Sequence, residues 1–228
     1  MRQFVRFQLR TTDVAASRKF YSRVLGDGPT DIEPLPDQAR ARGAPAHWLG
    51  HIGVENVEEA VRAFAQRAAI QLGPSRQTSE GGRVAILRDP GEAIVAVANG
   101  APSQTWWQPH VVWQDLYAAN AENTIDAYCA LFGWQLLDRH DLGWRGVRRE
   151  FTWRAGEPSV GSVADIAALT GVHSQWLFYF SVSALTPALA AVTAGGGVVV
   201  TLVTLPNESR AAVCTDPQGA AFALCEVP

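Results

Sequence analysis

The sequence predicts an α+β fold of four βαβββ modules arranged in two tandem domains, with the first module shortened. Three observations support this prediction. The second half of the chain repeats the first half. Within each half, a strand pattern followed by an amphipathic helix and further short strands occurs twice. The spacing between matched residues also changes along the chain, which indicates that a segment is missing from the first copy.

The repeat is carried by matched pairs of residues: Tyr21 with Tyr128, Trp48 with Trp176, and Asp89 with Asp216. The first pair is separated by 107 residues, whereas the other two pairs are separated by 128 and 127 residues. About 21 residues of the second copy therefore have no counterpart in the first. They correspond to two strands between Trp134 and Gly156, so we expect the sheet of the first domain to be incomplete.

Caps, periodicity and turn residues predict the individual elements. Asp13 can cap a helix over residues 14–25 that Gly26 ends, after an alternating strand over residues 4–10. A proline-rich loop follows, and the turn Asp89-Pro90-Gly91 joins two later strands into a hairpin. Further helices are expected over residues 57–69, 121–132 and 187–194. The expected strands span residues 48–54, 84–87, 93–98, 111–117, 134–138, 147–153, 159–163, 176–182, 198–202, 211–214 and 221–226. The two domains are expected at residues 1–100 and 110–228, joined by a linker over residues 101–109.

Composition excludes several classes of partner. With 47% hydrophobic and 18% charged residues, the chain of 228 residues can bury a sizeable core. Its net charge is −3 and it has no basic stripe, so nucleic acid is not an expected partner. No apolar run reaches the roughly 20 residues that a membrane span needs. The three cysteines lack metal-site spacing, which favours buried, reduced thiols and a cytoplasmic location.

Several motifs together resemble the vicinal oxygen chelate superfamily, which includes glyoxalases, bleomycin-resistance proteins and extradiol dioxygenases, and in particular its tandem, four-module bacterial members. The motifs are Thr12-Asp13 with Phe20-Tyr21 and Leu25-Gly26, Ala127-Tyr128 with Phe132-Gly133-Trp134, Val54-Glu55-Asn56-Val57, Trp176-Leu177-Phe178-Tyr179-Phe180, and Asp216-Pro217-Gln218-Gly219. The resemblance implies a cup-shaped site for a small molecule in each complete domain. It is far more specific to the fold than to an activity, because one fold hosts unrelated functions.

The same resemblance implies where a divalent metal would bind. The first-strand ligand positions fall on Arg6, Leu49, Trp113 and Leu177, and the last-strand glutamate positions fall near Ala96 and Ala223. None of these side chains is a plausible ligand for such a metal site. We therefore predict no cofactor, with a divalent metal as the alternative.

The positions two residues further along each first strand share its face and are all polar: Gln8, His51, Asp115 and Tyr179. Polar side chains on strands that otherwise bury apolar residues suggest ligand contacts, although hydrogen bonds inside a core would explain them too. The expected ligand-binding residues are Trp113, Asp115, Tyr117, Tyr179, Arg149, Gln8, His51 and Arg6. If the protein is catalytic, Asp115 and Tyr179 are the candidate acid and base. The complete second domain is the expected location.

The sequence therefore favours a metal-independent binding protein for a small aromatic or amphipathic molecule, held in the cup of the second domain. The alternative is an enzyme of the same superfamily, such as a lyase, isomerase or dioxygenase-like protein, either metal-independent or with atypical metal ligands. A third hypothesis is a homodimer that forms at the uncovered sheet edge of the shortened first domain. The eight tryptophans suit either a core or the wall of an aromatic pocket.

Overall fold

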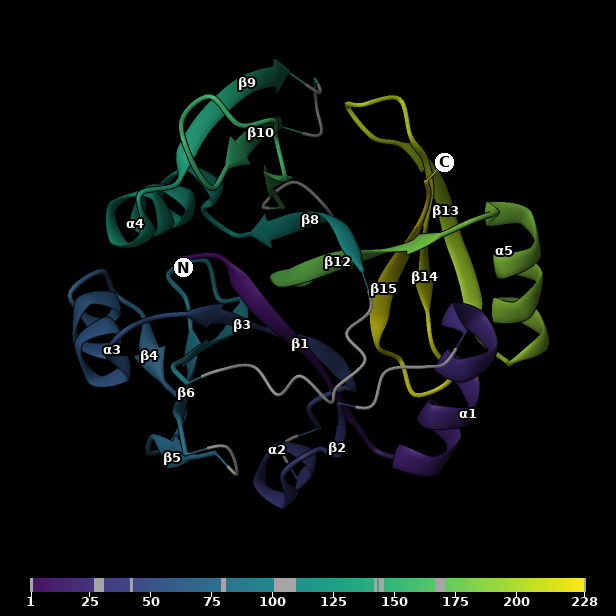
Figure 1. Cartoon of the computed structure of the whole chain (residues 1–228), viewed down its shortest axis with the longest axis horizontal. Helices are drawn as coiled ribbons and strands as arrows, with labels where there is room; N and C mark the ends of the chain where they lie inside the picture. Colours follow the sequence, from purple (N-terminus) through teal and green to yellow (C-terminus); the bar gives the residue numbers. More distant parts are fainter. Residues whose placement is uncertain are drawn as a thin grey trace. The chain divides into compact units, whose positions relative to one another are not determined.

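The computed structural model describes residues 2–26, 31–41, 43–78, 81–100, 110–141, 143, 146–166 and 171–227. Its helices and strands form two mixed sheets, called sheet A and sheet B here, with five helices among the described residues (Figure 1). This confirms the predicted α+β class. The predicted linker over residues 101–109 lies outside the described residues.

Sheet A has the strand order β2-β1-β3-β7-β6-β4, and β5 pairs with β6. Its strands are β1 (Phe4–Thr11), β2 (Ile32–Pro34), β3 (His47–Gly53), β4 (Ile70–Gln71), β5 (Arg76–Gln77), β6 (Arg83–Arg88) and β7 (Ile94–Ala98). Sheet B has the order β13-β14-β15-β12-β8-β11-β10-β9. Its strands are β8 (Val111–Ala118), β9 (Gln135–Asp141), β10 (Val147–Thr152), β11 (Gly161–Asp165), β12 (Gln175–Val182), β13 (Val198–Thr204), β14 (Arg210–Thr215) and β15 (Ala221–Glu226).

The strand pairing confirms that the first module is shortened. β2 runs parallel to β1, with Leu9 opposite Ile32, just as β11 runs parallel to β8 in the third module. β2 therefore corresponds to the last strand of a complete module. The two strands that precede β11, β9 and β10, have no counterpart between β1 and β2 among the described residues.

The helices are α1 (Val14–Leu25), α2 (Asp37–Ala41), α3 (Val57–Ala65), α4 (Ala121–Phe132) and α5 (Leu185–Ala194). The predicted bounds of α1 and α4 are confirmed. Both helices begin where the side chain of a cap residue, Asp13 or Asn120, accepts a hydrogen bond from a backbone amide of the first turn. Other predictions were wrong. α3 ends four residues early, α5 begins two residues before Pro187, and α2 and β2 lie in the segment expected to be a loop.

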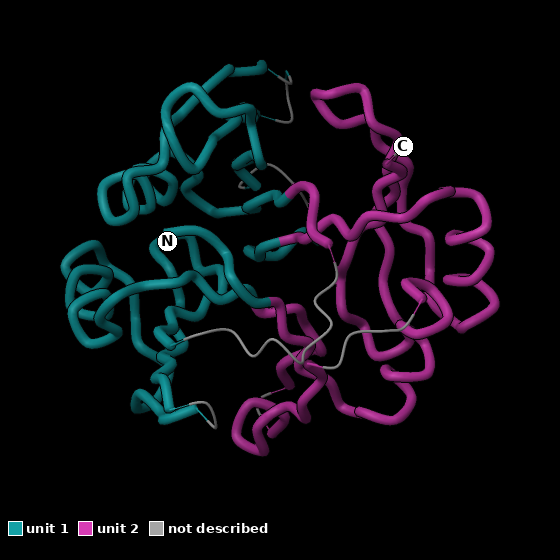
Figure 2. Tube along the Cα trace, in the orientation of Figure 1, with its two compact units in different colours: residues 1–6, 50–103, 114–176 teal, residues 7–49, 104–113, 177–228 magenta. Residues whose placement is uncertain are grey.

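The chain forms two compact units that interleave along the sequence (Figure 2). Unit 1 contains residues 1–6, 50–103 and 114–176, and unit 2 contains residues 7–49, 104–113 and 177–228. In unit 1, α3 packs against α4; in unit 2, α1 packs against α5. All strands of sheet A precede the predicted linker in the sequence and all strands of sheet B follow it. Each compact unit, in contrast, contains residues from both sides of that linker. The predicted domain bounds therefore stay a prediction.

A hydrogen-bonded chain of three repeat-matched residues lies in the core of unit 1. Tyr128 of α4 donates to the carboxylate of Asp89 at 2.9 Å, and the indole of Trp176 donates to the Tyr128 hydroxyl at 3.2 Å. The Tyr128 ring also stacks on Trp134, with centroids 5.0 Å apart. Because Asp89, Tyr128 and Trp176 belong to three different modules, this chain links modules two, three and four within one unit.

Unit 2 contains the matching chain. Tyr21 of α1 donates to Asp216 at 3.2 Å, and the indole of Trp48 donates to the Tyr21 hydroxyl at 3.0 Å. The Tyr21 ring contacts Phe222 edge to face, with centroids 5.4 Å apart. The repeated tyrosine, tryptophan and aspartate therefore perform the same task in both units, which is to join a helix of one module to the hairpin of another.

The hairpin that carries Asp89 packs closely on the start of α4. A Cβ atom added to Gly91 would lie only 2.5 Å from Thr124 Oγ1 and 2.6 Å from the Ala118 Cβ, so any side chain there would force a shift. The matched position in unit 2 is Gln218, whose side chain accepts a hydrogen bond from Ser17 at 3.0 Å. The two units thus fill the same position differently.

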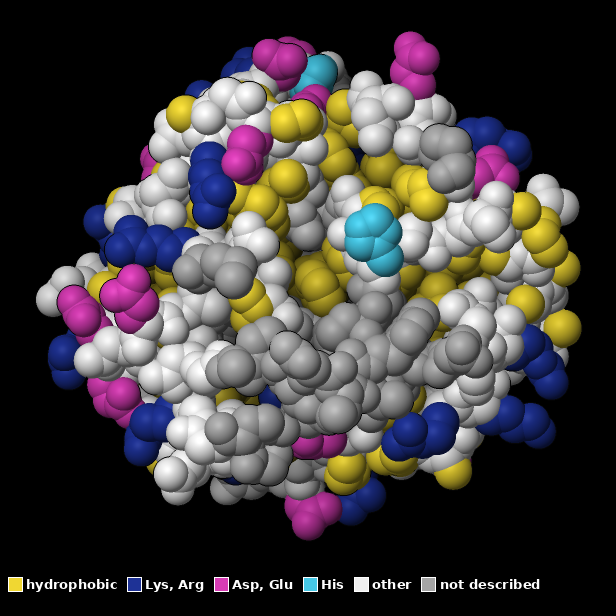
Figure 3. Space-filling model, viewed as in Figure 1, with side chains coloured by type: hydrophobic (Ala, Val, Ile, Leu, Met, Phe, Trp, Pro, Cys, Tyr) yellow, Lys and Arg dark blue, Asp and Glu magenta, His cyan; other side chains and the backbone are white. Residues whose placement is uncertain are grey.

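Charged side chains of both signs are mixed on the face drawn in Figure 3, and the described residues form no continuous basic stripe on it. No helix within the described parts of the chain is long and apolar enough to cross a membrane.

Candidate functional site

The most distinctive polar group in unit 1 is Asp115, at the middle of β8. Its carboxylate is buried, with only 1% of the residue exposed. Ser162 of β11 donates to Oδ1 at 2.6 Å, and Arg148 of β10 donates to Oδ2 at 3.1 Å. Asp115 is therefore a buried anion compensated by a guanidinium and a hydroxyl, the arrangement that such a charge requires.

The strand register places further charged residues on the same face of sheet B. Asp115 lies opposite Ser162, which in turn lies opposite Glu150, and cross-strand partners point to the same face. The Glu150 carboxylate is buried and lies 2.7 Å from His140 Nε2. We call the surface formed by these residues and Arg148 the Asp115 face. It carries two acids, a guanidinium, an imidazole and a hydroxyl within one compact unit.

The neighbours of Asp115 define what this face can do chemically. With Arg148 and Ser162 bound to its two oxygens, Asp115 is better suited to orienting the guanidinium than to accepting a proton from a ligand. The Arg148 side chain is 23% exposed, so part of it reaches the surface of the unit. His140 is 44% exposed, and its ring rests on the nearly buried Glu150. The face therefore presents an oriented guanidinium and an imidazole on carboxylate supports.

Arg149 lies on the opposite face, contrary to the prediction that it reaches into the cup. Arg149 lies opposite Val163, whereas Glu150 of the Asp115 face lies opposite the next residue of that strand, Ser162. Its side chain lines a cavity of about 280 Å³ together with Ile125 of α4 and Arg139. Because successive side chains on a strand alternate between faces, Arg148 occupies the position expected of Arg149.

The four matched polar positions are all buried, as their shared position on the first strands predicts. Three of them lie opposite a residue of the last strand of their module: His51 opposite Ala96, Asp115 opposite Ser162, and Tyr179 opposite Ala223. The fourth, Gln8, contacts Asp31, which directly precedes β2. Gln8 donates from its amide to the Asp31 carboxylate at 2.8 Å. The third module has a similar buried contact, in which the Ser162 hydroxyl donates to the Asp115 carboxylate. Arg6 is half-buried on β1, and Trp113 and Tyr117 lie on β8 on either side of Asp115.

Sequence reasoning missed Arg148, Ser162, Glu150 and His140 as members of this face. His140 lies within β9, which continues to Asp141 and so beyond the expected end of this strand at residue 138. The alternation of residues 147–152 held a signal, since Arg148 and Glu150 share one face of that strand. Their pairing with Asp115 requires the register of β8, β11 and β10, which residues far apart in the sequence determine.

No group of three or more His, Cys, Asp and Glu residues in the described ranges is placed to hold a metal ion. Burial raises the pKa of the Cys129 thiol to about 11 and that of Cys214 to about 12, so these thiols stay protonated near neutral pH and are poor nucleophiles.

The fold and the repeated modules define a protein of the glyoxalase-like class, and comparison with known families agrees. The sequence model of the Glyoxalase/Bleomycin resistance protein/Dioxygenase superfamily matches residues 107–224. The chain belongs to this superfamily.

Similar proteins are found among bacterial sequences and solved structures. The "Putative glyoxylase CFP32" of Mycobacterium tuberculosis is 27% identical over 95% of this chain and 91% of its own length. The anthracycline biosynthesis protein DnrV of Streptomyces peucetius is 24% identical over 97% of this chain and 92% of its own length.

Among solved structures, the 2,3-dioxygenase LapB of Pseudomonas sp. KL28 superposes with a TM-score of 0.66 at 12% identity, covering 99% of this chain and 92% of that one. The Mn(II)-bound glyoxalase of Novosphingobium aromaticivorans gives a TM-score of 0.67 at 8% identity, covering 98% and 81%. At this level of identity the two structures establish the fold alone.

Proposed function

We propose that this protein binds a small aromatic or amphipathic molecule at the Asp115 face of sheet B. The observation that carries the proposal is the buried Asp115 carboxylate of β8, which holds Arg148 of β10 at 3.1 Å and has Tyr117 two residues further along its own strand. A charged network of this kind is costly to bury, and a binding role accounts for its presence better than stability does. Flat apolar side chains beside a few oriented polar groups are typical of ligand sites.

The chemistry of the face suggests the class of ligand. A guanidinium oriented by a carboxylate recognises an oxygen acceptor such as a phenolate, carboxylate or quinone oxygen. Aromatic side chains favour a flat ligand body. One relative is named for anthracycline biosynthesis. We therefore propose a polycyclic aromatic ligand that carries such oxygens.

We also propose that binding needs no divalent metal. The positions that the superfamily uses for ligands are occupied by side chains such as Trp113 and Leu177, which supply no lone pair for such an ion. The Asp115 carboxylate lies on the same strand as Trp113, but the positively charged Arg148 is 3.1 Å from one of its oxygens. This positive charge opposes the binding of a metal cation there. The donor set therefore does not fit the metal that the fold implies.

A second candidate function is catalysis, and one contact favours it. His140 Nε2 and Glu150 Oε1 are 2.7 Å apart, so the imidazole of a partly exposed histidine is held by a nearly buried carboxylate. A histidine oriented in this way is suited to general acid–base chemistry. Similarity to a protein named as a glyoxylase is consistent with a lyase or isomerase reaction that uses this pair.

The binding proposal is tested by calorimetry and thermal-shift assays with 1,8-dihydroxyanthraquinone as the probe. We expect the wild type and Arg149→Met to bind it alike, because Arg149 points away from the face. Arg148→Met should weaken binding about tenfold or more, since a charge-assisted hydrogen bond is lost. Equal binding by both variants, or binding by none of the three proteins, would contradict the proposal.

Metal analysis of the purified protein separates the two functions further. A stoichiometric content of iron, manganese, nickel or zinc that binding or activity requires would refute metal independence. Turnover of an α-ketoaldehyde–thiol adduct or a catechol that His140→Gln abolishes would favour the enzyme. A cytoplasmic location and a homodimer are parts of the proposal as well, and sedimentation at several concentrations tests the dimer.

A further inference from the structure

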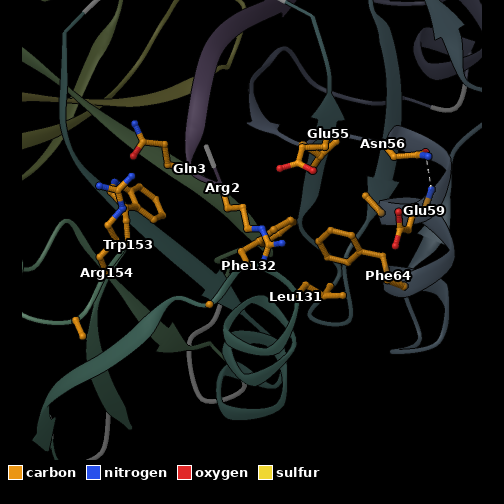
Figure 4. A pocket seen from close by; sticks show the side chains of 15 residues that line it. Arg2, Gln3, Glu55, Asn56, Glu59, Phe64, Leu131, Phe132, Trp153 and Arg154 are labelled. Carbon is orange, nitrogen blue, oxygen red and sulfur yellow. Dashed lines mark hydrogen bonds between the residues drawn. The ribbon is translucent and has the colours of Figure 1, made fainter.

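A cavity of about 630 Å³ opens in unit 1 between α3, the C-terminal end of α4 and the residues that precede β1 (Figure 4). Its volume lies in the range of small-molecule sites in proteins. None of its lining residues belongs to the Asp115 face. The cavity is therefore separate from the site proposed above.

The floor of the cavity is aromatic and rigidly supported. Phe64, Phe132 and Trp153 line it, and the rings of Phe64 and Phe132 have centroids 5.5 Å apart. Trp153 packs edge to face on the fully buried Trp134, with centroids 4.5 Å apart, and Phe132 contacts Trp134 at 5.7 Å. Because these rings are fixed by the core behind them, the floor is already formed before any ligand arrives.

Charges of opposite sign line the walls. Figure 4 shows Glu55 and Glu59 on the α3 side, Arg154 beside Trp153, and Arg2 between the two groups. No ion pair joins Arg2, Glu55 or Glu59 to any residue that the structure describes, and Arg154 makes only a long, exposed contact of 3.7 Å.

The neighbouring Glu58 behaves differently. It points away from the cavity lining and pairs with Arg83 at 2.6 Å. The segment that begins α3 therefore places Glu58 in an ion pair and leaves two glutamates at the cavity, Glu55 before the helix and Glu59 within it, which makes Glu58 a control for the charge of this segment.

We propose that this cavity is a second ligand site, for a small zwitterion with an apolar body, of the class of aromatic amino acids and their dipeptides. The ammonium group lies between the carboxylates of Glu55 and Glu59, and the carboxylate faces the guanidinium groups of Arg2 and Arg154. The aromatic ring rests on Phe132 and Trp153, with the buried Phe64 ring packed against Phe132 beneath. An anion alone would meet two glutamates and a cation alone would meet two arginines, so a zwitterion satisfies the walls best.

The test uses glycyl-phenylalanine as the probe, with its N-acetylated and C-amidated forms as controls. Calorimetry should give a dissociation constant for the zwitterion about tenfold lower than for either blocked form, because each block removes one charge-assisted contact. In ¹⁵N spectra, the probe should shift the Trp153 indole signal, which Trp153→Phe identifies.

Two variants around the start of α3 complete the test. Glu55→Gln/Glu59→Gln should weaken binding of the zwitterion about tenfold or more, whereas Glu58→Gln should leave it unchanged. These residues are at the surface, and circular dichroism checks that both variants fold. Absence of binding at millimolar probe, equal binding of the blocked forms, or equal effects of the two variants would overturn the proposal.

Discussion

Replacing Asp89 by asparagine is expected to change how stability depends on pH. The Asp89 carboxylate is buried and accepts hydrogen bonds from the amides of Gly91 and Ala93, both at 2.9 Å, and from Tyr128 at 2.9 Å. Burial nevertheless outweighs these contacts and raises the pKa of Asp89 from 3.8 to about 6. Burial also raises the pKa of Tyr128 well above its ordinary value, so the tyrosine stays a neutral donor.

The sign and size of the effect follow from linkage. A carboxyl group whose pKa is raised on folding stabilises the folded state fully below its unfolded pKa of 3.8, and this contribution is lost as the pH rises through about 6. At about 1.4 kcal/mol per pKa unit, Asp89 accounts for a loss of about 3 kcal/mol between these limits. Asparagine cannot ionise, so the Asp89→Asn variant should escape this loss.

Urea unfolding of the wild type and Asp89→Asn, followed by tryptophan fluorescence from pH 4 to 7.5, measures the difference directly. The unfolding free energy of the variant minus that of the wild type should rise by about 2–3 kcal/mol over this range, because the unfolded carboxyl is already partly ionised at pH 4. Asp13→Asn makes the same chemical change at an exposed helix cap and corrects for the general loss of a negative charge. A difference that stays constant with pH would refute burial as the dominant effect on Asp89.

Three further predictions concern single contacts. Arg148→Met should lower the unfolding free energy, measured by urea titration, by about 3–5 kcal/mol, because the Asp115 carboxylate then stays buried without its guanidinium partner. Adding Asp115→Asn to this variant should recover part of the loss. Gly91→Ala should cost about 1–3 kcal/mol, measured by thermal unfolding, because its Cβ would meet Thr124 at 2.5 Å; an unchanged melting temperature would contradict the close approach. Tyr21→Phe should cost about 1–3 kcal/mol in urea, since a buried carboxylate and an indole lose their partner, and a neutral result would show that neither bond matters.

Local signals predicted several elements well. The bounds of α1 were predicted correctly from the cap Asp13 and the terminating Gly26, features contained within a dozen residues. The predicted bounds of α4 were also correct, and the structure shows the equivalent residues Asn120 and Gly133 at its ends. The change of repeat spacing predicted the shortened first module. Alternation along β8 was enough to predict that Asp115 shares a face with Trp113 and Tyr117.

Other features depended on residues far apart in the sequence. The proline-rich segment contains a short strand and a helix, because β1 offers an edge to which Ile32–Pro34 can add in parallel. Arg149 was expected in the cup, but the register of β10 with β11 assigns that position to Arg148. The partner of a strand residue depends on the alignment of two strands, and neither strand encodes that alignment alone.

The sequence by itself therefore determined the class of fold, the four-module repeat, the missing strands and the polar positions on the first strands, because these depend on periodicity, caps and matched residues. Only the tertiary structure decided which modules share a compact unit, how Asp89, Tyr128 and Trp176 join into one hydrogen-bonded chain, and which arginine Asp115 holds. These features arise from contacts between segments that the chain brings together only when it folds, and their geometry is set by packing in the core.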